Sequence, residues 1–100
     1  MNIKKSSYGT THILAPVGKI DSNTAPELQA AVSQVPDSAK EIIFDFSAVD
    51  YISSAGLRVL VMSQSMMEDN GGSVTITNVN KIVDDIFAIT GFGELLTIER

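Results

Sequence analysis

A run of five residues near the middle of the chain, Ile42 to Phe46, is apolar at every position except Asp45. An apolar run without alternation is typical of a strand that is covered on both faces, as at the centre of a parallel sheet. Parallel strands need long crossover connections, which are usually helices, and cannot be joined by a tight turn. The sequence therefore predicts an α/β fold with Ile42–Phe46 as a central strand.

Three segments around this strand have apolar residues at helical spacing. The first of them starts with Thr24-Ala25-Pro26-Glu27, which has the spacing of a capping box, and Pro36 stops it. The expected helices extend from about Ala25 to Val35, from near Ala55 to the Asn70-Gly71-Gly72 turn, and from the cap residue Asn80 to the closing residue Gly91.

Four further segments have the pattern of strands. Ile3–Ser7 and Thr11–Val17 flank a turn at Gly9, which predicts a hairpin whose weakly apolar first strand lies at a sheet edge. Ser73–Thr77 alternates as a strand does, and Leu95–Ile98 is the last strand that we expect. The element order ββαβαβαβ predicts a single α/β domain with a mixed, mostly parallel sheet of about five strands and helices packed against it.

Composition restricts the class of function. The chain has 100 residues, which suits one domain over residues 1–100, and no cysteine, which excludes disulfides and thiol catalysis. Its net charge of −5 is spread without a basic stripe, so we expect a protein partner and no nucleic acid. Polar residues follow Met1-Asn2-Ile3-Lys4-Lys5, so we expect no signal peptide, no membrane and a cytoplasmic location. No metal or other cofactor is expected, because no cluster of ligands is visible.

Two serines, Ser53 and Ser54, lie between the central strand and the second helix. The first N–H groups of a helix lack partners and carry partial positive charge, so a hydroxyl or a phosphate is stabilised there. In open α/β sheets, the functional crevice lies beyond the carboxyl ends of parallel strands, where these serines are expected. On spacing alone, the simplest interpretation of such a pair is a helix N-cap.

Three segments of the chain resemble the STAS domains of bacterial anti-sigma factor antagonists: Gly18-Lys19-Ile20-Asp21, Asp45-Phe46-Ser47, and Tyr51-Ile52-Ser53-Ser54-Ala55-Gly56-Leu57. The resemblance covers essentially the whole chain. It implies a STAS-like fold and a regulatory protein that is not an enzyme. In that family, an anti-sigma factor serine kinase of the GHKL ATPase type phosphorylates a serine at the start of the helix. Only the unphosphorylated form binds the kinase and frees the sigma factor, and a serine phosphatase acts on the phosphorylated form.

The matching phosphoacceptor in this chain is Ser54, with Ser53 as the alternative. The family pattern is commonly Asp-Ser-(Ser/Thr/Ala)-Gly-Leu-Gly, and this chain has Ser53 in place of the aspartate and Arg58 in place of the last glycine. The first departure removes a carboxylate that could orient the hydroxyl or a metal ion. It leaves open which serine is used.

The resemblance also implies that the Gly18–Asp21 segment, between the second strand and the first helix, neighbours the serine loop on a partner-binding face. The expected partner-binding residues are Asp21, Ser22, Ser53, Ser54, Ala55, Gly56 and Arg58. Gly56 would let the backbone of a partner approach closely. Asp21 is accounted for equally well by hydrogen bonding within a turn.

Other interpretations of single residues compete with these. His12, the one histidine, could pair with Ser54 in a hydrolase, but no G-x-S-x-G elbow accompanies them. Met62, Met66 and Met67 could form an adaptable binding patch, although methionines at helical spacing are more often core. Asp45 could orient the serine loop, or it could cap the turn that follows its own strand.

Two other classes of function stay open at this stage. The chain could be a STAS scaffold or interaction module in a larger signalling or transport assembly, in which the serines act only as caps and are not phosphorylated. The replaced motif aspartate favours this alternative. A free helix N-terminus could also bind a nucleotide or a small anion, but the chain has no P-loop glycine pattern and no P-loop lysine.

Overall fold

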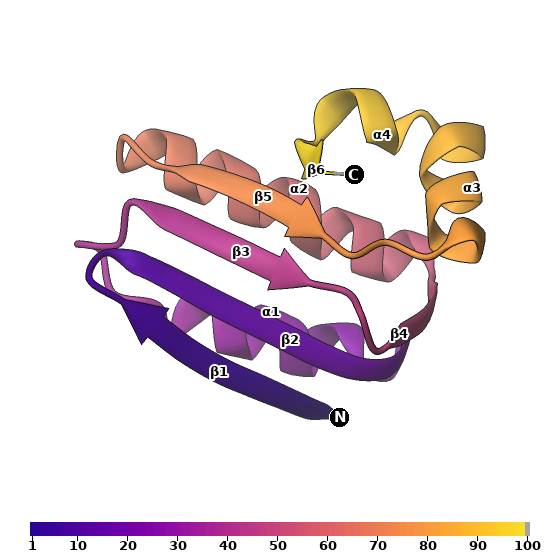
Figure 1. The fold of residues 1–100 in the computed structure, drawn as a ribbon, viewed down its shortest axis with the longest axis horizontal. Coiled ribbons are helices and arrows are strands. Elements are labelled where there is room, and N and C mark those ends of the chain that lie inside the picture. Colours follow the sequence, from indigo (N-terminus) through magenta and orange to yellow (C-terminus); the bar gives the residue numbers. More distant parts are fainter. Residues whose placement is uncertain (100) are drawn as a thin grey trace.

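The predicted hairpin is present at the start of the chain. The computed structural model describes residues 1–99, and in it β1 (Asn2–Tyr8) pairs antiparallel with β2 (Thr11–Ile20). The long β2 then pairs in parallel with β3 (Glu41–Asp45), which pairs with β5 (Ser73–Thr77), which in turn pairs with β6 (Ile98–Glu99). The strand order is therefore β1-β2-β3-β5-β6, so the sheet is mixed and mostly parallel, as predicted (Figure 1).

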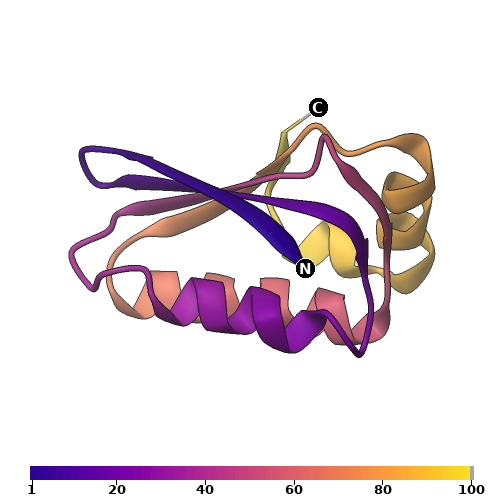
Figure 2. The same cartoon turned by 90° about the horizontal axis from the view of Figure 1, so that it is seen from below.

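Helices lie mainly on one face of this sheet. Figure 2 shows α1 (Ala25–Ser33) and α2 (Ser54–Asp69) side by side beneath the sheet. Helices α3 (Lys81–Thr90) and α4 (Phe92–Leu95) lie at one end of the sheet. Within residues 1–99, no helix is long and apolar enough to span a bilayer.

Much of the hydrophobic core lies between the sheet and helices α1 and α2, and Val83 and Phe87 of α3 are buried in the same core. Ile42 and Phe44 of β3 are fully buried, whereas Ile43 and Asp45, on the opposite face of the same strand, are only half-buried. Our expectation that this strand is covered on both faces is therefore wrong. It is a central strand whose second face is partly open, because β2 and β5 flank it and no helix in the described part of the chain crosses that face.

Two short elements were not predicted. Val49–Ile52 forms a strand, β4, that pairs in parallel with the end of β2, where the register shifts between Gly18 and Lys19. Residues Phe92–Leu95 form α4, so the last strand begins at Ile98 instead of Leu95. The predicted cap and stop of α3 are confirmed, because the Asn80 side chain accepts a hydrogen bond from the Val83 N–H (2.9 Å) and Gly91 has a φ of 77°.

Candidate functional site

The two serines lie where β4 ends and α2 begins, but they have different surroundings. The Ser53 N–H donates to the Ile20 carbonyl oxygen over 2.8 Å, which fixes the loop to the end of β2. Ser53 is the N-cap of α2, and its Oγ accepts a hydrogen bond from the Gly56 N–H at 3.5 Å. Ser54 is the first helical residue and is exposed. Ser53 therefore has a structural role, while Ser54 is exposed to solvent.

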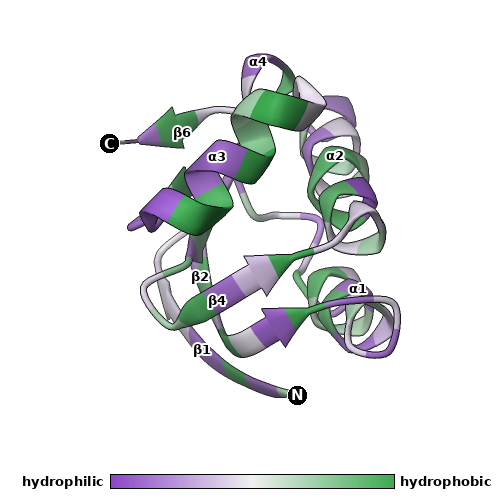
Figure 3. Ribbon diagram, turned by 90° about the vertical axis from the view of Figure 1, so that its right-hand side faces the viewer, coloured by the Kyte–Doolittle hydropathy of each residue, from purple (hydrophilic) through white to green (hydrophobic). Residues whose placement is uncertain are grey.

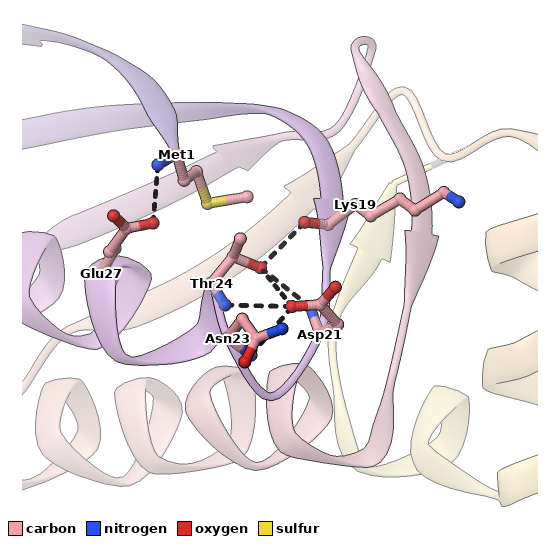
Figure 4. A network of polar contacts seen from close by, with 6 residues as sticks. All are labelled: Met1, Lys19, Asp21, Asn23, Thr24 and Glu27. Atoms are coloured by element: carbon pink, nitrogen blue, oxygen red, sulfur yellow. Dashed lines mark hydrogen bonds and ion pairs between the residues drawn. The ribbon is translucent and has the colours of Figure 1, made fainter.

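Asp21 organises the neighbouring loop between β2 and α1. Its Oδ1 accepts hydrogen bonds from the backbone N–H groups of Asn23 (2.9 Å) and Thr24 (3.0 Å), as Figure 4 shows. These bonds, led by the one from Thr24, hold the pKa of the Asp21 carboxyl below its ordinary value. The interpretation of Asp21 as a turn residue is thus confirmed. Its role as a partner contact stays a prediction.

The capping box predicted at Thr24 and Glu27 is not formed. The Thr24 hydroxyl donates to the Lys19 carbonyl oxygen (2.8 Å) and accepts from the Asp21 N–H (2.9 Å), so it bonds backward along the chain. The Glu27 carboxylate pairs with the Met1 ammonium group over 2.6 Å (Figure 4). Helix α1 begins instead on the Asp21 carbonyl oxygen, which accepts from the Ala25 N–H at 2.8 Å.

The starts of α1 and α2 meet at one end of the molecule, beside the ends of β2 and β4 (Figure 3). A cleft of about 320 Å³ lies between the two helices there. It is lined by Ser22, Ala25, Pro26 and Gln29 from one side and by Ala55, Arg58, Val59 and Met62 from the other. The structure therefore brings together residues from both loops that we predicted to share a partner-binding face.

Met62 also lines this cleft, which agrees with the methionine patch that the sequence offered only as the less favoured interpretation. Met62 is 45% exposed, whereas Met67 is buried and only 1% exposed. A second cleft of about 250 Å³ continues along the helices and is lined in part by Gln29, Met62 and Met66. The prediction that these methionines are core is confirmed for Met67 and is wrong for Met62. The sequence does carry a signal for this exposed apolar surface. It is a stripe along one side of α2, formed by Ala55, Val59, Met62 and Met66.

Gly56 lies inside the protein. A Cβ atom added to it would lie 2.6 Å from the Ile20 side chain and 2.7 Å from that of Ile52. These isoleucines end β2 and β4, so the absence of a side chain at Gly56 lets α2 approach both strand ends. The small residue that we assigned to partner contact has an internal packing role.

Asp45 caps the turn after its own strand. Its Oδ1 accepts hydrogen bonds from the Asn78 side-chain amide and from the Ser47 backbone N–H, each at 3.0 Å. The bond from Asn78 is the main cause that lowers the pKa of the Asp45 carboxyl, and the Ser47 bond adds to it. Asp45 therefore joins the ends of β3 and β5 and is explained without a role in the serine loop.

The replacement Asp45→Asn tests this cap. Because the pKa in the folded state is lower than the usual value of about 4, the carboxylate stabilises the fold above that pH, and the contribution disappears as the pH falls through the lower folded value. We expect a loss of about 1 kcal/mol of unfolding free energy at pH 7 and a smaller loss near pH 2. Urea denaturation at both pH values measures this, with Asp37→Asn in an exposed turn as the control. An equal loss at both pH values would contradict it.

A pairing of His12 with Ser54 is excluded by the sheet. His12 lies at the start of β2, and Ser53 bonds to Ile20 at the end of the same strand. Eight residues of extended chain separate His12 from Ile20 by roughly 25 Å, far beyond hydrogen-bond reach. The serine loop has no histidine base.

Comparison with known proteins places this arrangement in context. A family model described as the STAS domain matches residues 2–100. BtrV of Bordetella bronchiseptica, provisionally named an anti-sigma factor antagonist, is 32% identical over 82 residues, which cover 81% of this chain and 71% of BtrV. The anti-sigma-B factor antagonist of Bacillus subtilis is 28% identical over 81 residues, covering 81% of this chain and 74% of that protein.

A solved structure shares the fold. The anti-sigma factor antagonist SpoIIAA in its unphosphorylated form superposes with a TM-score of 0.83 at 16% identity, covering 99% of this chain and 89% of SpoIIAA. The phosphorylated form of SpoIIAA from Bacillus superposes with a TM-score of 0.75 at the same 16% identity, covering 99% and 92%. At this identity the likeness concerns the fold.

Proposed function

The chain belongs to the STAS domain family, among relatives that are anti-sigma factor antagonists, and from this premise we propose that it is a partner-switching regulator. Its unphosphorylated form binds an anti-sigma factor that is also a serine kinase of the GHKL ATPase type, and this binding releases a sigma factor. Phosphorylation of Ser54 abolishes binding, and a serine phosphatase restores it. The protein acts in the cytoplasm by binding alone and has no catalytic activity of its own.

The observation that carries this proposal is the different use of the two serines. Ser53 is the N-cap and bonds through its backbone to β2, whereas Ser54 is exposed at the first position of α2. A kinase needs a hydroxyl that it can reach, so Ser54 is the better acceptor. Ala55 and Arg58, which follow Ser54 on α2, line a cleft that a partner would cover, so a phosphate on Ser54 would lie at the edge of the interface.

Two carboxylates at this end of the molecule support the proposal that phosphorylation weakens the binding of a partner. Asp21 and Asp50 lie in the β2–α1 loop and in β4, close to the start of α2. A phosphate adds a charge of about −1.5 to −2 beside these two carboxylates, which opposes docking of a partner that presents negative charge there. The fold tolerates the phosphate, because the start of a helix stabilises negative charge.

Mass spectrometry of the protein purified from its native cells tests the proposal. We expect a single phosphate on Ser54, which phosphatase treatment removes and which Ser54→Ala abolishes. The matched control is Ser53→Ala, which should keep the phosphate on Ser54 while it loses about 1 kcal/mol of stability with its cap. Phosphate on Ser53, or none under any growth condition, would overturn the switch and favour an unphosphorylated STAS scaffold.

A further inference from the structure

Arg58 lies one helical turn after Ser54 on α2, and both side chains are exposed. Residues four apart on a helix are surface neighbours, with Cβ atoms about 5–6 Å from each other. Arg58 is also the only basic residue in the sequences of α1 and α2. In the part of the chain that the structure describes, its guanidinium makes no ion pair. The cation is therefore available to an anion on Ser54 or on a docking partner.

Arg58 also lies at the cleft between the two helices. It lines this cleft together with Ser22, Pro26 and Met62, where a docking partner would contact it in the unphosphorylated protein. The remainder of the lining is mostly apolar, so Arg58 provides the main charge of that surface. A phosphate that captured its guanidinium would change the surface without any change of fold.

We propose that Arg58 is a phosphate-binding residue, whose guanidinium pairs with a phosphate on Ser54 and is thereby withdrawn from the partner-binding cleft. The proposal rests on the proposed function, because it takes Ser54 as the phosphoacceptor. A phosphate presents three acceptor oxygens, and the planar guanidinium offers donors in a geometry that matches two of them. An anion that precedes a cation by four residues is also the more favourable order on a helix.

This pairing would give phosphorylation two effects on docking. It adds negative charge beside Asp21 and Asp50, and it engages the one cation that α1 and α2 offer to a partner. Both effects weaken the binding of a partner that uses a carboxylate to contact Arg58. Arg58, which replaces the last glycine of the family pattern, would thus strengthen the effect of phosphorylation on docking.

The test uses the full chain with phosphoserine installed at position 54 by genetic-code expansion, so that no kinase is needed. Phosphorus NMR then follows the second ionisation of the phosphate with pH in the wild type and in Arg58→Gln. We expect the pKa of the phosphate to be lower in the wild type by about half a unit, because a paired cation favours the dianion. Arg58→Lys should keep part of this shift, since it retains the charge but loses the forked geometry.

Phosphoserine at position 53 provides the matched control. One turn after Ser53 lies Leu57, which is buried, so Arg58→Gln should leave the titration of that phosphate unchanged. The charges of Lys19, Asp21 and Asp50 are the same in all variants, and their field cancels in the comparison. Equal pKa values at position 54 with and without Arg58, or an equal shift at position 53, would overturn the pairing.

The two proposals fail separately. Absence of phosphate on Ser54 in cells would overturn the proposed function, but it would not alter the titration of an installed phosphoserine. Equal titrations of wild type and Arg58→Gln would overturn the role of Arg58 and would leave the phosphorylation of Ser54 standing.

Discussion

Ser54→Asp is expected to weaken binding of the proposed anti-sigma kinase partner by about 100-fold or more, whereas Ser54→Ala binds as wild type. Ser54 is exposed beside the cleft between α1 and α2, so the new carboxylate would be covered when the partner docks. A loss of about 2.7 kcal/mol suffices for a 100-fold change, and an unpaired charge in an interface costs this much or more. Isothermal titration calorimetry against the purified partner measures the affinities.

Ser65→Asp is the matched control for charge. Ser65 is also an exposed serine of α2, but it lies about three turns beyond Ser54 and lines neither cleft between the helices. We expect its affinity to stay within about threefold of wild type, because exposed charges are screened over such a distance. If Ser54→Asp bound as tightly as Ser54→Ala, the chain would not be a switch and the scaffold alternative would gain support.

The features predicted correctly have local signals in the sequence. The hairpin follows from the Gly9 turn between two strand patterns, and the cap and stop of α3 follow from Asn80 and Gly91. Each of these depends on interactions within a few residues. A local signal of the same kind, two hydroxyl residues before a helical pattern, predicts that Ser53 and Ser54 lie at the start of α2, which is the centre of the candidate site.

The features that were missed depend on partners far away in the sequence. β4 has two exposed residues among its four and forms only by pairing with the end of β2. The Thr24 hydroxyl donates to the Lys19 carbonyl oxygen, and the Glu27 carboxylate pairs with the Met1 ammonium group. Although the two residues have the spacing of a capping box, neither side chain is therefore bonded as a capping box requires. The exposure of Met62 likewise depends on how closely α1 packs on α2, which apolar spacing does not show.

Gly56→Ala is the second large effect that we expect, and it is a destabilisation. In an exposed helix, this change gains up to about 1 kcal/mol, because alanine favours the helix. Here the new methyl group would lie 2.6 Å from Ile20 Cγ2 and 2.7 Å from Ile52 Cγ1. Both isoleucines are fully buried and branched at Cβ, so neither can rotate away easily. We expect a net loss of about 1–3 kcal/mol, measured by urea denaturation.

Gly93→Ala in α4 separates this clash from the general effect of the change. A Cβ atom at Gly93 would lie 3.4 Å from the nearest atom, the Cβ of Phe87, so stability should stay within about 0.5 kcal/mol of wild type. If Gly56→Ala were as stable as Gly93→Ala, the close approach of α2 to the strand ends would be wrong, and partner contact would again be the simplest explanation of Gly56. If it is destabilised as expected, Gly56 holds the first turn of α2, and with it Ser54, against the ends of β2 and β4, so the site depends on this packing before any partner binds.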